Sequence, residues 1–102
     1  MNNRKIALTE QERNIILAIL ENYPKTVLFG SRIKGTSKQF SDLDICLKDD
    51  IKDYEIQLLR EAFEESRLPF KVDIVVYRRV DDVFKKIIDD QAVPLTALAE
   101  QV

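Results

Sequence analysis

The sequence predicts an α/β domain in which helices pack on one face of a small mixed β-sheet. Three observations support this fold class: three segments have the apolar spacing of amphipathic helices, three short segments are rich in apolar and β-branched residues, and glycine, proline or paired aspartates separate them. With 102 residues, of which 45% are apolar, the chain is expected to form a single domain over residues 1–102 with a thin core.

The first predicted elements are a helix over residues 9–22 and a strand over residues 25–29. Thr9 and Glu12 have the spacing of a capping box, in which each side chain accepts a hydrogen bond from the other residue's backbone, and apolar residues follow at helical spacing. The next segment, KTVLF, is short and apolar, and Gly30 ends it. A short buried strand is therefore expected after the helix.

Two longer strands are predicted over residues 42–48 and 70–77, because the side chains along both alternate between an apolar face and a second face. A helix is expected between them over residues 49–67, and a last helix over residues 81–90, while the pattern assigns no element to residues 91–102. The helical side chains expected to face the core are Ile51, Tyr54, Leu58, Leu59, Ala62 and Phe63, then Val83, Phe84, Ile87 and Ile88.

Three aspartates occupy equivalent positions on the two alternating strands. Asp42 and Asp44 lie opposite the apolar face of the first strand, and Asp73 lies opposite the apolar face of the second. Strands that follow each other in the sequence are neighbours in roughly two-thirds of cases, so the three carboxylates are expected to converge on the face that the helices leave open. The alternative is that all three are solvent-facing residues of half-exposed strands.

Converging carboxylates predict a site for a hard divalent cation. Their charges would repel one another unless a cation neutralised them, and oxygen ligands favour Mg²⁺ or Mn²⁺. The sequence has no histidine and one cysteine, Cys46, which excludes zinc sites built from these residues, Ser–His and Cys–His nucleophiles, and a disulfide within the chain. Cys46 is expected to be a packing residue. An EF-hand is excluded because Leu47 stands where such a loop requires glycine.

Charge and hydropathy limit the partners of the chain. The net charge of −2 argues against direct, stable binding to nucleic acid, which requires a basic surface. No apolar run is long enough to span a bilayer, and the N-terminus lacks the pattern of a signal peptide, so a cytoplasmic location without membrane contact is expected. Arg78 and Arg79 are expected to be solvated at a strand end, and contact with a phosphate or an acceptor is the alternative.

The two glycines of the chain, Gly30 and Gly35, bracket a segment that begins with the hydroxyl of Ser31. The cationic side chains of this region are Arg32, Lys34 and Lys38. Backbone N–H groups at glycine-rich turns bind phosphate oxygens, so the segment fits a loop that holds an anionic triphosphate. The alternative is that the glycines only turn the chain at a strand end. A P-loop is excluded because the Gly-Lys-Ser/Thr sequence is absent.

The stretch GSRIKGTSKQFSDLD resembles the signature of the DNA polymerase β-like nucleotidyltransferase superfamily, in which Gly-Ser is followed by ten residues and then Asp-x-Asp. Here Gly30 and Ser31 precede residues 32–41, and Asp42 and Asp44 follow. The chain, which has no room for a second substrate-binding domain, is similar in length to the minimal nucleotidyltransferases (MNT). In that subgroup the proteins are antitoxins paired with HEPN-domain ribonuclease toxins.

The resemblance implies a nucleotidyltransferase fold and a reaction that moves AMP from ATP to a tyrosine of a HEPN toxin, in a homo- or hetero-oligomer. It implies two Mg²⁺ ions, with Mn²⁺ as an alternative. The residues that it assigns to the metals are Asp42, Asp44 and Asp73, and those that it assigns to the nucleotide phosphates are Gly30, Ser31 and Arg32. Asp73 would also position or deprotonate the attacking hydroxyl.

Two other functions remain open at this stage. The first is nucleotidylation of a small molecule such as an aminoglycoside, or of RNA. A small-molecule acceptor would call for a further helical domain, and RNA would call for a basic surface. The second is a binding-only antitoxin, which neutralises a toxin by occupying it and needs no carboxylate chemistry.

Overall fold

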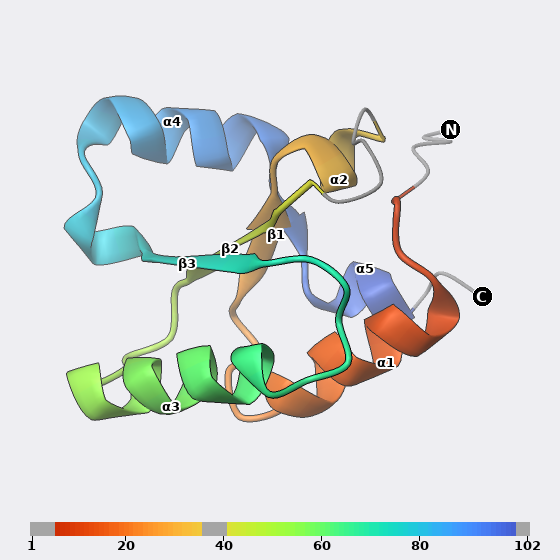
Figure 1. Cartoon of the computed structure of the whole chain (residues 1–102). Helices are drawn as coiled ribbons and strands as arrows, with labels where there is room; N and C mark the ends of the chain where they lie inside the picture. Colours follow the sequence, from red (N-terminus) through yellow and green to blue (C-terminus); the bar gives the residue numbers. More distant parts are fainter. Residues whose placement is uncertain (1–5, 36–40, 100–102) are drawn as a thin grey trace.

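A four-stranded mixed sheet in the order β3-β2-β1-β4 forms the centre of the computed structural model, which describes residues 6–35 and 41–99 (Figure 1). The strands are β1 (Val27–Phe29), β2 (Leu43–Leu47), β3 (Val72–Val76) and β4 (Val93–Pro94). The helices are α1 (Glu10–Ile19), α2 (Ser31–Lys34), α3 (Asp53–Glu64), α4 (Asp82–Gln91) and α5 (Thr96–Ala99), with a 3₁₀ turn, η1 (Tyr77–Arg79), after β3. The α/β fold class and the mixed sheet are confirmed.

Strand pairing places the two alternating strands side by side. β2 and β3 are parallel neighbours, and their register sets Asp44 opposite Asp73. β1 is antiparallel to β2 and sets Phe29 opposite Asp44. On its other side β1 pairs with β4, where Val93 lies opposite Leu28. The predicted adjacency of the two aspartate-bearing strands is therefore confirmed, whereas β4 and α5 occupy a segment to which the sequence pattern assigned no element.

The capping box that begins α1 forms as expected. The backbone N–H of Glu12 donates to Thr9 Oγ1 over 3.1 Å, and the backbone N–H of Thr9 donates to Glu12 Oε1 over 2.9 Å. These bonds satisfy two backbone donors that the first helical turn leaves without partners. Buried Ile16 and the buried cap residue Leu20 then fix this helix against the sheet.

The main core lies between the sheet and the helices α1, α3 and α5 (Figure 1). Its buried strand side chains include Leu28, Leu43, Ile45, Leu47, Ile74 and Val76. These are the apolar positions of the alternating pattern. Burial of the apolar face of a strand is the main favourable term in the formation of such a layer.

Helix α4 covers the second face of the sheet, which corrects the expectation that helices pack on one face only (Figure 1). Phe29, Cys46 and Ile88 form a buried cluster there, and the rings of Phe29 and Phe84 meet edge to face with centroids 5.8 Å apart. The physical reason is that this face is apolar toward the C-terminal end of β2. As expected, Cys46 is a buried packing residue, and burial raises the pKa of its thiol to about 11.

Helices α3 and α4 each present a narrower apolar stripe to the core than the sequence predicts. Tyr54 and Leu58 on α3 are 63% and 58% exposed, and Val83 and Ile87 on α4 are 74% and 42% exposed. In both helices the exposed pair is one turn apart, on the side away from the sheet. A helix that contacts the sheet on one side buries only the residues that face it, so apolar spacing alone overestimates the buried set.

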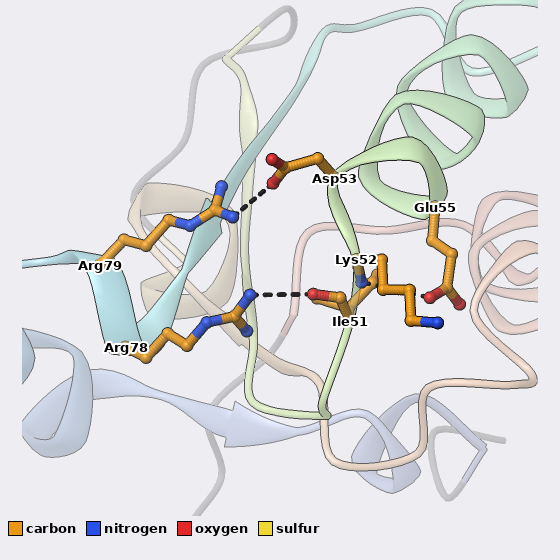
Figure 2. A network of polar contacts seen from close by, with 6 residues as sticks. All are labelled: Ile51, Lys52, Asp53, Glu55, Arg78 and Arg79. Carbon is orange, nitrogen blue, oxygen red and sulfur yellow. Dashed lines mark hydrogen bonds and ion pairs between the residues drawn. The ribbon is translucent and has the colours of Figure 1, made fainter.

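The C-terminal ends of β2 and β3 are joined by polar contacts that involve both arginines of η1 (Figure 2). Arg78 Nη2 donates to the backbone oxygen of Ile51 over 2.9 Å, and Arg79 forms an ion pair with Asp53 at the start of α3. The two arginines therefore hold the loop before α3 to the turn after β3. They lie at the opposite end of these parallel strands from Asp42, Asp44 and Asp73.

No helix in the two described segments is both long and apolar enough to cross a membrane.

Candidate active site

Gly30 allows the end of β1 to approach the carboxylate of Asp44. Its φ is +89° and its ψ is −170°, a combination that is essentially restricted to glycine. A Cβ at this position would lie 2.1 Å from Asp44 Oδ2, which is far inside van der Waals contact. Both the backbone conformation and the close approach therefore require glycine. This contact brings the start of the Gly-Ser segment directly against the aspartate strand.

The segment between the two glycines forms one helical turn, α2, where the sequence predicted an open loop. The backbone N–H groups of Ile33 and Lys34 donate to the backbone oxygen of Gly30, both over 3.1 Å. Gly35 ends the turn in the left-handed conformation, with φ +80°, and its N–H donates to the backbone oxygen of Ser31. The half-buried Ser31 thus follows directly on Gly30, the residue that contacts Asp44. Lys38, expected to contribute charge, lies outside the described residues.

The three predicted aspartates share one electrostatic environment at the N-terminal ends of β2 and β3. Asp44 is half-buried, while Asp42 and Asp73 are exposed. Burial first, and then the negative charges of Asp73 and Asp42, together raise the pKa of Asp44 from its ordinary 3.8 to about 6. Two neighbouring carboxylates thus disfavour the ionised form of Asp44, and a bound cation would stabilise that form.

The donor chemistry fits a hard divalent cation, but the side chains are not arranged around one point. Across residues 6–35 and 41–99, no group of three or more His, Cys, Asp and Glu side chains has the arrangement of a metal site. Like charges repel, and exposed aspartates reduce that repulsion by rotating apart. The exposure of Asp42 and Asp73 permits the opposite rotation toward Asp44. Oxygen donors of this kind suit Mg²⁺ or Mn²⁺.

The raised pKa of Asp44 predicts a pH-dependent stability. A carboxyl group whose pKa is higher in the folded state than its ordinary 3.8 contributes stability below about pH 4, and that stability is lost as the pH rises through about 6. Because the side chain is only half-buried, we expect this group to contribute about 1–2 kcal/mol after allowance for solvent screening. Urea unfolding at several pH values, without divalent cations, measures this as the difference between wild type and Asp44→Asn. A difference that does not change with pH would contradict the assignment.

Arg32 is buried, although the sequence predicted that it contacts phosphate. Only 5% of it is exposed. Its Nε donates to the backbone oxygen of Ser41 over 2.6 Å, its Nη1 donates to that of Ala7 over 2.8 Å, and its guanidinium lies 3.9 Å from the centre of the Phe70 ring. In this conformation Arg32 joins the N-terminal segment, the entry to β2 and the entry to β3. No pattern in the sequence indicated that the Phe70 ring contacts the Arg32 guanidinium.

Replacement of Arg32 distinguishes these two roles. Arg32→Ala is expected to lower the free energy of unfolding by about 2–4 kcal/mol, because two partly buried carbonyl oxygens lose charged donors and the Phe70 ring loses its cation. Arg32→Lys should not restore this stability, because an ammonium lacks the planar, multiply donating group. Chemical denaturation measures both variants. Unchanged stability combined with a raised KM for ATP would instead support direct phosphate contact.

A cavity of about 450 Å³, with Phe70 and Asp73 among its lining residues, was not predicted from the sequence. The cavity lies between the C-terminal end of α3 and the beginning of β3. Its apolar walls include Phe63, Leu68 and Phe70, and Asp73 is among its lining residues. Sequence periodicity could not reveal it, because it depends on how far the segment between α3 and β3 stands from the strand edge.

Comparison with known proteins decides the family. The family model described as polymerase beta, nucleotidyltransferase matches residues 9–100. The chain belongs to this nucleotidyltransferase family. The matched range includes Gly30, Ser31 and all three aspartates, so the resemblance seen in the sequence is confirmed at the level of the family.

One relative and two solved structures are similar to this nucleotidyltransferase domain. A probable protein adenylyltransferase MntA from Haemophilus influenzae is 39% identical over 62 residues, which make up 59% of this chain and 54% of the relative. The match thus spans about half the length of that protein. The crystal structure of a toxin–antitoxin with AMP-PNP superposes with a TM-score of 0.65 and 29% identity, over 81% of this chain and 71% of the other. A mutant MntA–HpeT toxin–antitoxin structure (TM-score 0.58, 23% identity, 81% and 70% coverage) supports the fold alone.

Proposed function

We propose that this protein is a Mg²⁺-dependent nucleotidyltransferase that moves AMP from ATP to a tyrosine hydroxyl of a HEPN-domain toxin and thereby acts as an antitoxin. The observation that carries the proposal is the contact between the Gly-Ser segment and the carboxylates. Gly30 meets Asp44, and Asp44 lies opposite Asp73 in the sheet register. Nucleotidyl transfer requires a segment that holds phosphate beside carboxylates that hold metal ions, so this contact supports the proposal.

The proposed roles follow from position. The backbone at Gly30 and the Ser31 hydroxyl would hold the β- and γ-phosphates, because backbone N–H groups at such turns and hydroxyl groups donate hydrogen bonds to phosphate oxygens. Asp42, Asp44 and Asp73 would hold Mg²⁺, and the bound ion would supply positive charge to neutralise the triphosphate and the leaving pyrophosphate. Asp73, which is exposed on the edge strand, would position the attacking hydroxyl and accept its proton.

The names of the relatives support the choice of donor and acceptor. The H. influenzae relative is called a probable protein adenylyltransferase, and the superposed structure is of a toxin–antitoxin with AMP-PNP. A protein acceptor and an adenine nucleotide are therefore proposed here. A small-molecule or RNA acceptor has no comparable support.

Co-expression with a HEPN-domain toxin tests the proposal. Mass spectrometry of the purified toxin is expected to show the added mass of AMP on a tyrosine, and the Asp42→Asn and Asp44→Asn variants are expected to abolish it. Toxin that stays unmodified with wild type would contradict the proposal.

The same system tests the binding-only alternative. If the triple Asp→Asn variant at residues 42, 44 and 73 still protects growing cells from the toxin, neutralisation depends on binding and not on transfer. We expect protection to be lost.

A further inference from the structure

Strand β3 has an outer edge that pairs with no other strand in the part of the chain that the structure describes. It is the outermost strand in the order β3-β2-β1-β4 (Figure 1). The N–H of Leu43 donates to the backbone oxygen of Lys71 over 2.9 Å, and Leu43 lies opposite Val72 in the parallel register. Alternate residues of a parallel strand bond to its neighbour, so the backbones of Val72 and Ile74 face outward. An open edge of this kind is a template for another strand.

The side chains at the beginning of β3 are arranged symmetrically about Val72. The stretch over residues 70–74 reads Phe-Lys-Val-Asp-Ile, with an apolar residue at each end and opposite charges on either side of the valine. Phe70, Val72 and Ile74 belong to the core beneath α3 or pack against it. The alternation of the strand therefore places the exposed Lys71 and Asp73 together on the other face. A stretch with this order is complementary to an antiparallel copy of itself.

Antiparallel pairing of two such edges about Val72 sets opposite charges against each other. The two Val72 residues form a hydrogen-bonded pair, because the N–H and C=O groups of both face outward. Lys71 of each copy then lies opposite Asp73 of the other, in non-hydrogen-bonded pairs, where side chains approach most closely. A two-fold axis at Ile74 would instead set Asp73 opposite Val75. The charges therefore select the register about Val72, and the two-fold axis forms each charge pair twice.

Helix α3, beside this edge, carries a second charge pair with the same symmetry. Arg60 Nη2 donates to the outward-facing backbone oxygen of Ile74 over 3.4 Å, and the exposed Glu64 lies one turn further along the helix. Because α3 and β3 run in opposite directions, Glu64 lies nearer to the beginning of β3, and it lines the same cavity as Phe70 (Figure 1). Antiparallel pairing about Val72 sets Ile74 opposite Phe70 of the second copy. It thereby brings Arg60 toward Glu64 of that copy, so the helix layer selects the same axis as the strand layer.

We propose that the β3 edge is a dimerisation surface, on which two copies of this chain pair antiparallel through residues 70–74 about a two-fold axis at Val72. The two sheets then form one continuous sheet with the β3 strands at its centre. The pairing uses only the first part of each β3 strand, so the interface is small and the dimer is expected to be weak and dependent on concentration. The dimer requires neither ATP nor a toxin, so it does not depend on the proposed transfer reaction.

Analytical ultracentrifugation of the full chain over a series of concentrations tests the dimer. Low salt preserves the charge pairs, and Mg²⁺ is left out because Asp73 is also a proposed ligand of that ion. Lys71→Asp is expected to raise the dissociation constant of the dimer about tenfold or more, because it sets like charges opposite each other. Lys86→Asp, the same change at an exposed lysine of α4, should leave the constant unchanged. A chain that is monomeric at every concentration, or a dimer that Lys71→Asp does not weaken, overturns the proposal.

Charge swaps separate the proposed pairs from a general effect of net charge. Lys71→Asp combined with Asp73→Lys keeps the net charge and restores opposite charges, so this double variant should dimerise like wild type. Arg60→Glu should weaken the dimer, and its combination with Glu64→Arg should restore it. All four side chains are exposed, so the variants are expected to fold, and their melting temperatures check this. A double variant that stays as weak as its single variant overturns the axis at Val72.

Amide hydrogen exchange shows whether the strand edge itself forms the contact. A higher protein concentration should slow the exchange of the N–H groups of Val72 and Ile74, which face outward in the monomer. The N–H of Asp50, an exposed residue outside this edge, should exchange at the same rate throughout. A dimer that leaves the first two amides unprotected overturns the proposal. If the chain stays monomeric and a HEPN-domain toxin protects these amides, the edge binds a segment of the toxin and pairing between copies is overturned.

Discussion

Asp44→Asn is expected to reduce AMP transfer to the toxin by about 10³-fold and, at the same time, to make the protein more stable at neutral pH. The first effect follows because the central carboxylate of the site loses its charge. The second follows because burial and the neighbouring Asp73 and Asp42 raise the pKa of Asp44 to about 6, so that its ionised form is unfavourable in the folded protein. Removal of that charge should raise the melting temperature by about 5 °C or more without divalent cations.

Added Mg²⁺ should affect the stability of wild type and of Asp44→Asn differently. Mg²⁺ bound only by the folded state stabilises it by mass action, so we expect wild type, but not Asp44→Asn, to gain melting temperature as Mg²⁺ is added. Asp50→Asn, an exposed change outside the site, is the matched control and should alter neither transfer nor stability. An Asp44→Asn protein that is less stable than wild type, or that retains transfer, would contradict the proposed role of this residue.

Gly30→Ala is expected to damage both folding and activity. The backbone conformation is essentially restricted to glycine, and the added Cβ would lie 2.1 Å from Asp44 Oδ2. We expect a loss of about 3 kcal/mol or more in the free energy of unfolding and a fall in melting temperature of about 10 °C or more, with transfer lost because Asp44 must move. Thermal unfolding and a transfer assay measure the two effects.

The double variant with Asp44→Ala shows whether the steric contact is the cause. Removal of the Asp44 carboxylate relieves the closest contacts, so the double variant should be more stable than Gly30→Ala alone. Gly35→Ala is the comparison, since it also places a side chain at positive φ but in the milder left-handed helical region, at an expected cost of about 1 kcal/mol. Additive effects of the two changes at Gly30 and Asp44 would show that the contact does not matter.

Local patterns predicted the elements that position the site. The Thr9–Glu12 capping box predicted the start of α1, and the alternation of side chains predicted β2 and β3 with their aspartates on one face. β4 was not predicted, because two residues form a strand only through pairing with β1. The position of α4 on the second face was also missed, since it depends on tertiary packing around Phe29 and Cys46.

Within the site, the spacing of residues along the sequence predicted which segments meet, but it did not predict which side chains are buried. The positions of the glycine and aspartate residues predicted which backbone segments meet, because a strand end and a register are local properties. The burial of Arg32 was not predictable, since the carbonyl oxygens of Ala7 and Ser41 that it binds come from distant segments. The cavity with Asp73 among its lining residues was not predictable either, because its walls come from two segments, α3 and the entry to β3.

The position of the transferred phosphorus tests the central claim, nucleotidyl transfer, most directly. The purified toxin is incubated with this protein, Mg²⁺, and ATP labelled at either the α- or the γ-phosphate. We predict that label enters the toxin only from the α-phosphate, with release of pyrophosphate, and that Asp42→Asn and Asp44→Asn prevent it. Label that enters from the γ-phosphate, or α-label that enters equally well with the two variants, would contradict the account.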